Sequence, residues 1–408
     1  MAQRIALKDI CKIYDGPHAT PTKTIDGPIY LGIDAITEDG KLDSSQFAHL
    51  SEADYLKWTK RVTPQYGDIV FSYEATLGRY ALIPEEFYGC LGRRLAVIRN
   101  TSLDVDTTWL YYYFRSPEWT NFIQSKIVKG STVNRLSIED FPSYTIPKVP
   151  IESQKRIAHI LSCIDKKIHD NDAVNDNLQQ MAKTIYDYWF TQFDFPNNDG
   201  KPYRSSGGPM VWDDNLKKEI PQGWTSGQLS DIANIAMGQS PEGSTYNEEQ
   251  NGTVFFQGCT DFGNRFPEPR VYTTAPTRFA KAGDILMSVR APVGTLNIAL
   301  EDCCIGRGLA ALNSKFGSQL HLMYTLVMFK SHFDIMDSNG TTFGSITKDE
   351  LYEMKVVIPP AEQMEAFERM VQPIEQKIKQ CELENRELTR QRNWLLPMLM
   401  NGQASVSD

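Results

Sequence analysis

Several motifs that mark common catalytic and metal-binding proteins are missing from this 408-residue sequence. It has no G-x-x-x-x-G-K-[ST] segment, which excludes a P-loop nucleotide site. The Asn/Asp-Pro-Pro-Tyr/Phe tetrapeptide, by which amino-methyltransferases hold a flipped base, is absent as well. The six histidines form no H-E-x-x-H or other ligand pair, and the seven cysteines form no C-x-x-C pair. No metal site is therefore indicated, and no cluster of acids and lysine typical of a nuclease stands out.

Long hydrophobic runs are also missing. The first residues, MAQRIALKDICKIYD, have no apolar signal core, and no window reaches the roughly 18 uninterrupted apolar residues of a membrane span. Scattered cysteines fit a reducing compartment, so we expect a cytoplasmic protein without membrane contact. The net charge of -9 argues mildly against a nucleic-acid binder. It is not decisive, because an acidic protein can carry local basic patches.

The strongest pattern in the chain is a seam of apolar or small residues that recurs with alternating spacing of 4 and 3. This spacing favours coiled-coil pairing of helices. The pattern occupies residues 151–190 and returns at 361–400, and 175 + 210 = 385 relates Asn175 to Asn385. The seam positions are Ile157, Leu161, Ile164, Ile168, Asn175, Leu178 and Ile185 in the first stretch, and Val371, Ile374, Ile378, Asn385, Leu388 and Leu395 in the second.

These two stretches predict helices of ~60 Å each at 1.5 Å per residue. An ordinary helical hairpin in a core is the alternative, but the faces off the seam are heavily polar, which favours a rod in solvent. If the helices pair antiparallel about a pseudo-two-fold axis, Asn175 and Asn385 should lie close together near its centre. Pro373 either begins the regular part of the second helix or kinks it, and we favour a helix that begins or restarts close to Gln372.

The rest of the chain is also duplicated. Gly67-Asp68-Ile69-Val70-Phe71-Ser72 corresponds to Gly283-Asp284-Ile285-Leu286-Met287-Ser288, at an offset of 283 − 67 = 216. Cys90-Leu91-Gly92-Arg93 corresponds to Cys304-Ile305-Gly306-Arg307, at 304 − 90 = 214. A repeat of this length indicates a duplicated domain plus helix. Because the surface loops differ between the copies, the two modules are expected to bind different things.

Local signals indicate that each module is mixed α/β. The first is expected to hold strands near 28–33 and 68–73, a helix after Ser51, and helices within 107–128 broken at Ser116-Pro117. Residues 191–223 have the composition of a surface linker, although Trp212 and Trp224 are expected to be buried. The dinucleotide-binding pattern G-x-G-x-x-A is matched by Gly306-Arg307-Gly308-Leu309-Ala310-Ala311. A dinucleotide site is not indicated, because the expected strand–turn–helix context is missing.

Basic residues gather in both modules, and arginine and lysine can hold phosphates while arginine can also read guanine. A solvated charged face is the alternative reading, but two such sets in equivalent modules favour DNA. The first set is Lys57, Lys60, Arg61, Arg79, Arg93, Arg94, Lys126, Lys129 and Arg135, and the second is Arg265, Arg270, Arg278, Lys281, Arg290, Arg307 and Lys348.

Several segments resemble those of the specificity subunits of type I restriction-modification systems, over essentially the whole chain. They include Phe193-Asp194-Phe195-Pro196, Gly200-Lys201-Pro202-Tyr203, Ser205–Trp212 with Ile220–Trp224, Ile358–Gln363 and Leu396–Gly402. The first copy departs at Pro147–Gln154, a looser version of the Pro-Pro-x-x-Glu-Gln pattern.

This resemblance implies an α+β fold: two homologous mixed α/β target-recognition domains separated by two long helices that pair as an antiparallel coiled coil with pseudo-two-fold symmetry. It assigns domain 1 to 1–150, spacer helix 1 to 151–190, a linker to 191–223, domain 2 to 224–358, spacer helix 2 to 359–402 and a tail to 403–408.

The resemblance also implies a non-catalytic subunit that reads a split, asymmetric site on double-stranded DNA. Its partners would be two methyltransferase subunits and two restriction subunits, which would use the S-adenosylmethionine, ATP and magnesium. Two rival hypotheses stay open, a standalone DNA-acting nuclease or methyltransferase and a coiled-coil scaffold that does not bind DNA. The loop residues that we expect to contact DNA are Tyr73, Arg79, Arg93, Arg94, Asn134 and Arg135 in the first module, and Arg270, Arg290, Arg307 and Thr342 in the second.

Overall fold

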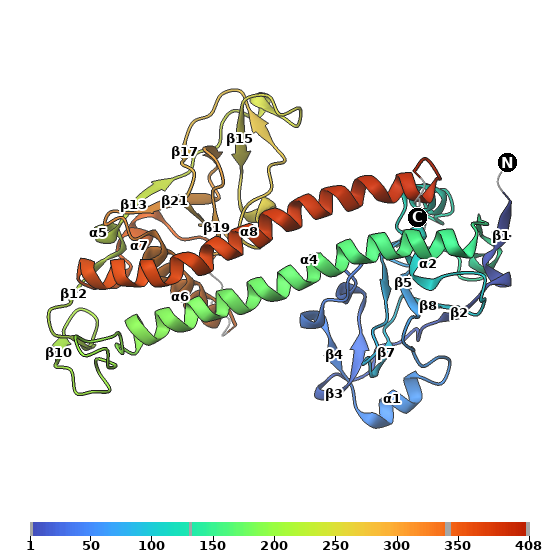
Figure 1. Cartoon of the computed structure of the whole chain (residues 1–408), viewed down its shortest axis with the longest axis horizontal. Helices are drawn as coiled ribbons and strands as arrows, with labels where there is room; N and C mark the ends of the chain where they lie inside the picture. Colours follow the sequence, from blue (N-terminus) through green and yellow to red (C-terminus); the bar gives the residue numbers. More distant parts are fainter. Residues whose placement is uncertain (1–2, 130–132, 339–343, 405–408) are drawn as a thin grey trace. The chain divides into compact units, whose positions relative to one another are not determined.

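The computed structural model describes residues 3–129, 133–338 and 344–404, and Figure 1 shows its elements in chain order. The chain divides into two compact units. Unit 1 combines Met1–Ile168 with Glu387–Asp408, and unit 2 is His169–Arg386. Each unit therefore contains one module and a part of both long helices, α4 (Ile151–Tyr186) and α8 (Ala361–Met400). Within the described ranges, no helix is long and apolar enough to cross a membrane.

The first module is built on a four-stranded antiparallel sheet of order β2-β8-β5-β6, beside a three-stranded sheet of order β4-β3-β7 in which β3 and β7 are parallel. Its strands are β1 (Arg4–Ala6), β2 (Cys11–Asp15), β3 (Thr24–Leu31), β4 (Ala48–His49), β5 (Ile69–Ser72), β6 (Tyr80–Leu82), β7 (Gly89–Leu91), β8 (Leu95–Asn100) and β9 (Thr145–Pro147). Its helices are α1 (Glu52–Trp58), α2 (Thr107–Phe114) and α3 (Pro117–Gln124), and β1 pairs with β9.

The second module repeats this plan with the order β13-β21-β18-β19, and its second sheet, β14-β16-β15-β20-β17, again contains one parallel pair, β15 with β20. Its strands are β12 (Thr225–Gln228), β13 (Ala233–Met237), β14 (Tyr246–Asn247), β15 (Thr253–Phe256), β16 (Tyr272–Thr273), β17 (Phe279–Ala280), β18 (Ile285–Ser288), β19 (Leu296–Ile298), β20 (Cys303–Ile305), β21 (Leu309–Ser314) and β22 (Lys355–Ile358). Its helices are α5 (Leu229–Ile232), α6 (Gln319–Ser338) and α7 (Lys348–Tyr352), and β12 pairs with β22.

The repeated Gly-Asp-Ile segment leads into one of the two central strands of each four-stranded sheet, β5 or β18, which begins at the isoleucine. In β5, Ile69 and Phe71 pack into one hydrophobic cluster, while Val70 points into another on the opposite face. In β18, Ile285 and Leu286 separate in the same way. Successive side chains of a strand point to opposite faces, so a strand covered on both faces is apolar throughout. The duplicated apolar run is thus explained by burial, and the predicted α+β class is confirmed.

The predicted helix starts after Ser51 and Ser116 are present, because each serine side chain accepts a hydrogen bond from a backbone N–H of the first turn. The linker contains a hairpin of β10 (Met210–Asp213) and β11 (Lys218–Pro221). Trp224 is buried as expected, but Trp212 is 61% exposed, so that expectation was wrong. Trp212 lies on this two-stranded hairpin, where its indole N–H bonds Asp214.

All the predicted seam positions are buried or partly buried, in the parts of the two long helices that belong to each unit. Those buried are Ile157, Leu161, Ile168, Asn175, Val371, Ile374, Ile378 and Asn385. Those partly buried are Ile164, Leu178, Ile185, Leu388 and Leu395.

Within each unit the two helices run antiparallel. In unit 1, Asp165 meets Arg392 at 2.7 Å, and Leu161 shares a hydrophobic cluster with Leu399. In unit 2, Asn171 donates to Asn385 at 2.9 Å. Further along, Tyr186 and Phe367 pack with ring centroids 5.8 Å apart. In both units the residue numbers of α4 rise as those of α8 fall, which is the antiparallel arrangement.

The two seam asparagines, which are expected to lie close together, each form a hydrogen bond with a different residue of the opposite helix. The Asn385 oxygen accepts from Asn171, whereas Asn175 donates to Glu382 at 2.8 Å. Asn171 and Asn175 are one turn apart on α4, and Glu382 and Asn385 are one turn apart on α8, so the two pairs form adjacent polar layers. The structure therefore places two polar layers in this part of the seam.

The expectation that the second long helix starts near Gln372 was wrong. Helix α8 is continuous from Ala361 and passes through Pro373. A proline inside a helix removes one backbone N–H bond, which weakens the helix locally. Here Val371 and Ile374, on either side, are buried in the unit 2 core. We attribute the continuity of the helix to this packing.

Candidate nucleic-acid interface

Three segments meet at one edge of the first module and bring together most of its predicted site residues. The Tyr73 N–H donates to the Arg94 carbonyl at 3.2 Å, and the Leu136 N–H donates to the Tyr73 carbonyl at 2.8 Å. Glu74 forms an isolated antiparallel bridge with Arg135. The Ala75 N–H donates to the carbonyl of Asn134 at 3.3 Å. Segments 73–75, 93–94 and 134–135 therefore form one backbone frame.

The second module builds the same frame from equivalent positions. The Val289 N–H donates to the Gly308 carbonyl at 2.9 Å, and the Ile346 N–H donates to the Val289 carbonyl at 2.9 Å. Arg290 forms the isolated bridge with Ser345. Because 74 + 216 = 290 and 135 + 210 = 345, this bridge corresponds to the one between Glu74 and Arg135.

The side chains presented by the two frames differ. Arg290 occupies the position of Glu74, and Ser345 occupies the position of Arg135, while Arg307 corresponds to Arg93. Two surfaces with one backbone geometry and different side chains can present different donors and acceptors to DNA.

Arg93 and Arg307 are the most closely matched pair. Each follows a glycine after a buried strand, β7 or β20, and each side chain is exposed. The backbone N–H of Arg93 donates to the Tyr30 hydroxyl at 3.2 Å, and that of Arg307 donates to Ser240 Oγ at 3.2 Å. In both modules a side-chain hydroxyl fixes the backbone of the turn while the guanidinium extends into solvent.

Three other predicted arginines are already paired with carboxylates. Arg79 bonds Glu38 and the Ile36 carbonyl, both at 3.1 Å. The Arg94 Nε lies 3.6 Å from Glu74, and Arg94 has a positive φ of 73°. Arg270 bonds Asp261 at 2.9 Å. These guanidiniums support loops, and contact with DNA would require them to share or exchange these partners.

Tyr73, which is predicted to be a DNA-contacting loop residue, has a buried side chain. It is only 7% exposed, and its counterpart Val289 is buried too, so both belong to the core beneath the frame. Burial and the nearby Asp15 carboxylate raise the pKa of the Tyr73 hydroxyl. Asn134, Arg135 and Arg290 are exposed, and Thr342 lies outside the described residues.

Sequence reasoning missed Glu74 and Ser345 because it selected donor-rich residues within each module separately. The signal was available, because the offsets that relate the strands also relate Glu74 to Arg290 and Arg135 to Ser345. It also left out Trp58 and His18, which line a basic pocket beside the first frame. Among the described residues, no group of three or more His, Cys, Asp or Glu side chains forms a metal-binding cluster.

Comparisons with known proteins agree with this architecture. A family model described as the type I restriction modification DNA specificity domain matches residues 3–180 and again residues 221–390. A Methanocaldococcus jannaschii protein described as the type I restriction enzyme MjaX specificity subunit is 30% identical, and the alignment covers 98% of this chain and 93% of the relative. The MjaIX specificity subunit of the same organism is 26% identical over 85% of this chain and 80% of its own length.

A solved S subunit of a type I restriction-modification system from M. genitalium has the same fold. The two chains are 16% identical, with 97% of this chain and 95% of that chain covered at a TM-score of 0.55. The family model covers most of the sequence in two copies, and each copy contains one of the two modules that share one strand order and most of the long helix that follows it. The chain therefore belongs to the type I restriction-modification DNA specificity family.

Proposed function

We propose that this protein is the specificity subunit of a type I restriction-modification complex and reads an asymmetric, two-part site on double-stranded DNA, one part through each module. The observation that carries the proposal is that one backbone frame occurs in both modules with different side chains. The bridged pair is Glu74 and Arg135 in one copy and Arg290 and Ser345 in the other. The shared frame gives both modules the same way of approaching DNA. The different side chains give the two modules different sequence preferences.

The proposed reading residues are those that the frames expose to solvent. Arg93 and Arg307 are the leading candidates, since a bidentate arginine–guanine contact is the commonest specific contact in the major groove. Arg135, Asn134 and Arg290 flank them. Arg79, Arg94 and Arg270 are assigned to loop support or phosphate contact, because each already has a carboxylate partner.

The proposed partners are two methyltransferase subunits and two restriction subunits. Binding of S-adenosylmethionine, ATP and magnesium would then fall to those subunits. The long helices are proposed to dock the methyltransferase subunits and to set the number of base pairs between the two half-sites. Their largely polar outer faces and continuous length support this role.

Mapping of adenine methylation in cells that carry the complex tests the proposal. The expected result is one split motif with two unlike halves, which disappears when this chain is deleted and returns when it is restored. Methylation or cleavage by the purified chain alone, with ATP, magnesium and S-adenosylmethionine, would favour a standalone enzyme. Failure to capture both methyltransferase subunits and duplex DNA would favour a scaffold without DNA contact.

A further inference from the structure

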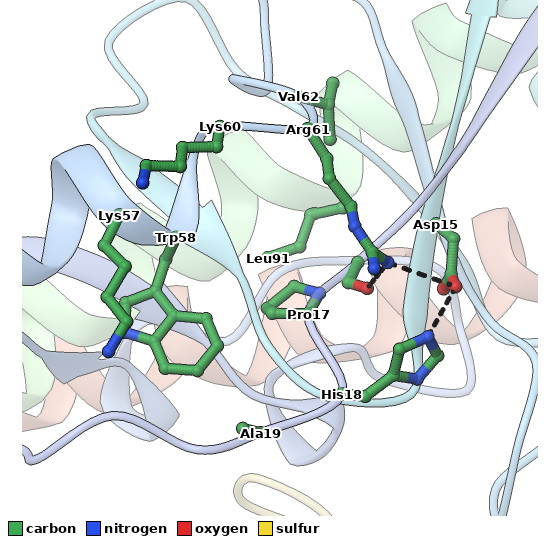
Figure 2. Close-up of a pocket in the computed structure, with 11 residues that line it drawn as sticks. Asp15, Pro17, His18, Ala19, Lys57, Trp58, Lys60, Arg61, Val62 and Leu91 are labelled. Carbon is green, nitrogen blue, oxygen red and sulfur yellow. Dashed lines mark hydrogen bonds and ion pairs between the residues drawn. The ribbon is translucent and has the colours of Figure 1, made fainter.

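A basic pocket lies beside the backbone frame of the first module. It has a volume of about 390 Å³ and is formed by the segment that follows β2, the end of α1 and Leu91 of β7. Figure 2 shows the indole of Trp58 on one side and the side chains of Arg61 and His18 on the other, with Pro17 between them. The pocket therefore has an apolar wall and a polar wall.

The rim of the pocket carries more positive than negative charge. Lys57, Lys60 and Arg61 line it, and Asp15 is the one carboxylate among its lining residues. Both lysines are exposed, and within the described part of the chain neither has a carboxylate partner within ion-pair distance. Lys57 Nζ lies 5.5 Å from the centroid of the Trp58 ring. Two ammonium groups are thus available to a ligand.

The Asp15 carboxylate is already paired with two side chains of the polar wall, those of His18 and Arg61. His18 Nε2 lies 2.9 Å from Asp15 Oδ2, and Arg61 Nη1 lies 3.7 Å from the same oxygen. Arg61 Nη1 also donates to the Gly16 carbonyl at 3.4 Å. These contacts hold the guanidinium at the mouth of the pocket, while its side chain remains 61% exposed. The carboxylate therefore orients a cation more than it repels an anionic ligand.

The pocket lies close to the proposed reading surface. Leu91, in its lining, is the last residue of β7 and precedes Arg93 by two residues. Trp58 packs against the cluster that contains Tyr30, and the Tyr30 hydroxyl accepts the hydrogen bond from the Arg93 N–H. The wall of the pocket and the backbone of Arg93 thus belong to one packed group.

From this arrangement we propose that the pocket binds the sugar-phosphate backbone of DNA at the edge of the half-site read by the first module. Lys57, Lys60 and Arg61 would contact phosphates, and Trp58 with Pro17 would pack against a deoxyribose. Lysine acts on phosphate as a mobile point charge, which gives affinity without sequence information. The inference rests on the proposed function, because it assumes that the first module binds DNA.

The test compares the variant Lys57→Ala/Lys60→Ala with the control Lys8→Ala/Lys12→Ala, which removes two exposed lysines of the same module away from the pocket. Full-length chain in complex with its methyltransferase subunits is titrated with a duplex that carries the methylated motif and with a scrambled duplex, over a range of salt concentrations. The pocket variant should bind both duplexes more weakly by the same factor. Its salt slope should fall by about 1.8 if two phosphate contacts are lost, and the control should change neither quantity.

Arg61→Ala and Arg61→Lys refine the same test. A phosphate contact predicts that Arg61→Ala weakens binding to both duplexes and that Arg61→Lys restores most of the loss, because the charge is kept. An unchanged salt slope in the Lys57→Ala/Lys60→Ala variant overturns the proposal, as does weaker binding of that variant to the motif duplex alone or an altered methylation motif. If the unaltered complex shows no preference for its motif, the proposed function fails, and that result is distinct from each of these.

Discussion

The Tyr324 hydroxyl donates a hydrogen bond to Glu375 Oε1 at 2.6 Å, which joins α6 of the second module to the long helix α8. The first module has the same connection, because the Tyr112 hydroxyl donates to Asp165 Oδ2 at 2.6 Å and joins α2 to α4. The carboxylates are equivalent, since 165 + 210 = 375. Each module is therefore attached to a long helix by a tyrosine–carboxylate bond at the same point of the repeat.

The arginine that completes each site comes from a different place. Arg265, from the loop before β16, is paired with Glu375 in the second module, and both side chains are buried. In the first module, Asp165 is paired at 2.7 Å with Arg392 of α8. Both modules therefore have the tyrosine–carboxylate bond, but the arginine paired with the carboxylate comes from a loop in the second module and from α8 in the first.

Arg265→Ala should be strongly destabilising, because it leaves Glu375 charged and buried with only Tyr324 as a close donor. Removal of one partner of a buried ion pair costs about 3–5 kcal/mol. Urea denaturation followed by circular dichroism measures the change. Arg390→Ala, which removes the exposed pair with Glu387, serves as the control and should leave the midpoint unchanged. Equal midpoints for the two variants would contradict the assigned role of Arg265.

Arg392→Ala should cost less than Arg265→Ala. The Asp165 side chain is 23% exposed, so water can solvate it after the loss of Arg392. Tyr112 and Arg115 also remain close to Asp165, the latter with Nη1 at 3.9 Å. We expect a loss of about 1–2 kcal/mol in the same denaturation experiment. A loss as large as that of Arg265→Ala would show that partial exposure does not relieve the unpaired carboxylate.

His321 should make the stability of the protein dependent on pH. Its ring is 3% exposed and packs edge-to-face on Phe190 with centroids 4.7 Å apart. Burial lowers the pKa of His321 to about 4, so the unfolded chain takes up this proton near pH 6.5 and the folded chain does not. The stabilising contribution is therefore complete above pH 6.5 and declines as the pH falls toward 4.

Between pH 7 and pH 5 this residue alone should reduce the free energy of unfolding by about 2 kcal/mol. Urea midpoints at several pH values in that interval measure the decline. His321→Gln removes the titrating group, so its profile should be flatter than that of the unaltered chain, whatever its absolute stability. Parallel profiles would mean that His321 does not carry this dependence.

Part of this organisation was readable from the sequence. The offset of 210 identified the helix pair and the equivalent seam positions, because a repeated 4,3 spacing reflects burial along one helix face. The partners of Asn175 and Asn385 could not be read from it. Seam spacing specifies a face, whereas the pairing depends on the register between two helices, and here Asn171 and Glu382 take part.

The unbroken helix at Pro373 and the buried side chain of Tyr73 have a similar origin. Local rules predicted a helix break at the proline, but the apolar contacts of Val371 and Ile374 accompany an unbroken helix. Tyr73 lies in the loop that follows β5, as expected, but backbone bonds to two distant segments enclose it. In both cases tertiary contacts decided the outcome, and these join residues too distant in sequence for a short pattern to reveal.

The length of the two long helices should determine the spacer of the DNA site. One added heptad in each helix preserves the 4,3 seam and lengthens the pair by about 10 Å, or about three base pairs. Adenine methylation mapping should then show the same two half-sites with a longer spacer. Replacement of one existing heptad by a different apolar-seam heptad is the control and should leave the spacer unchanged. An unchanged spacer in the insertion variant would refute the proposal that helix length sets the spacer.

Arg93→Ala and Arg307→Ala should each relax one half of the motif and leave the other half intact. The two guanidiniums occupy equivalent exposed turns in separate modules, and the backbone of each turn is held independently of the arginine side chain. Loss of a base contact costs about 1–3 kcal/mol at one position, whereas loss of a phosphate contact weakens binding to all sequences alike. Methylation mapping of the two variants separates these outcomes, and Arg270→Ala, which removes the arginine paired with Asp261, provides the comparison. Uniformly reduced methylation with an unchanged motif would assign Arg93 and Arg307 to phosphate contact, and relaxation of the same half-site by both would contradict the division of the site between the modules.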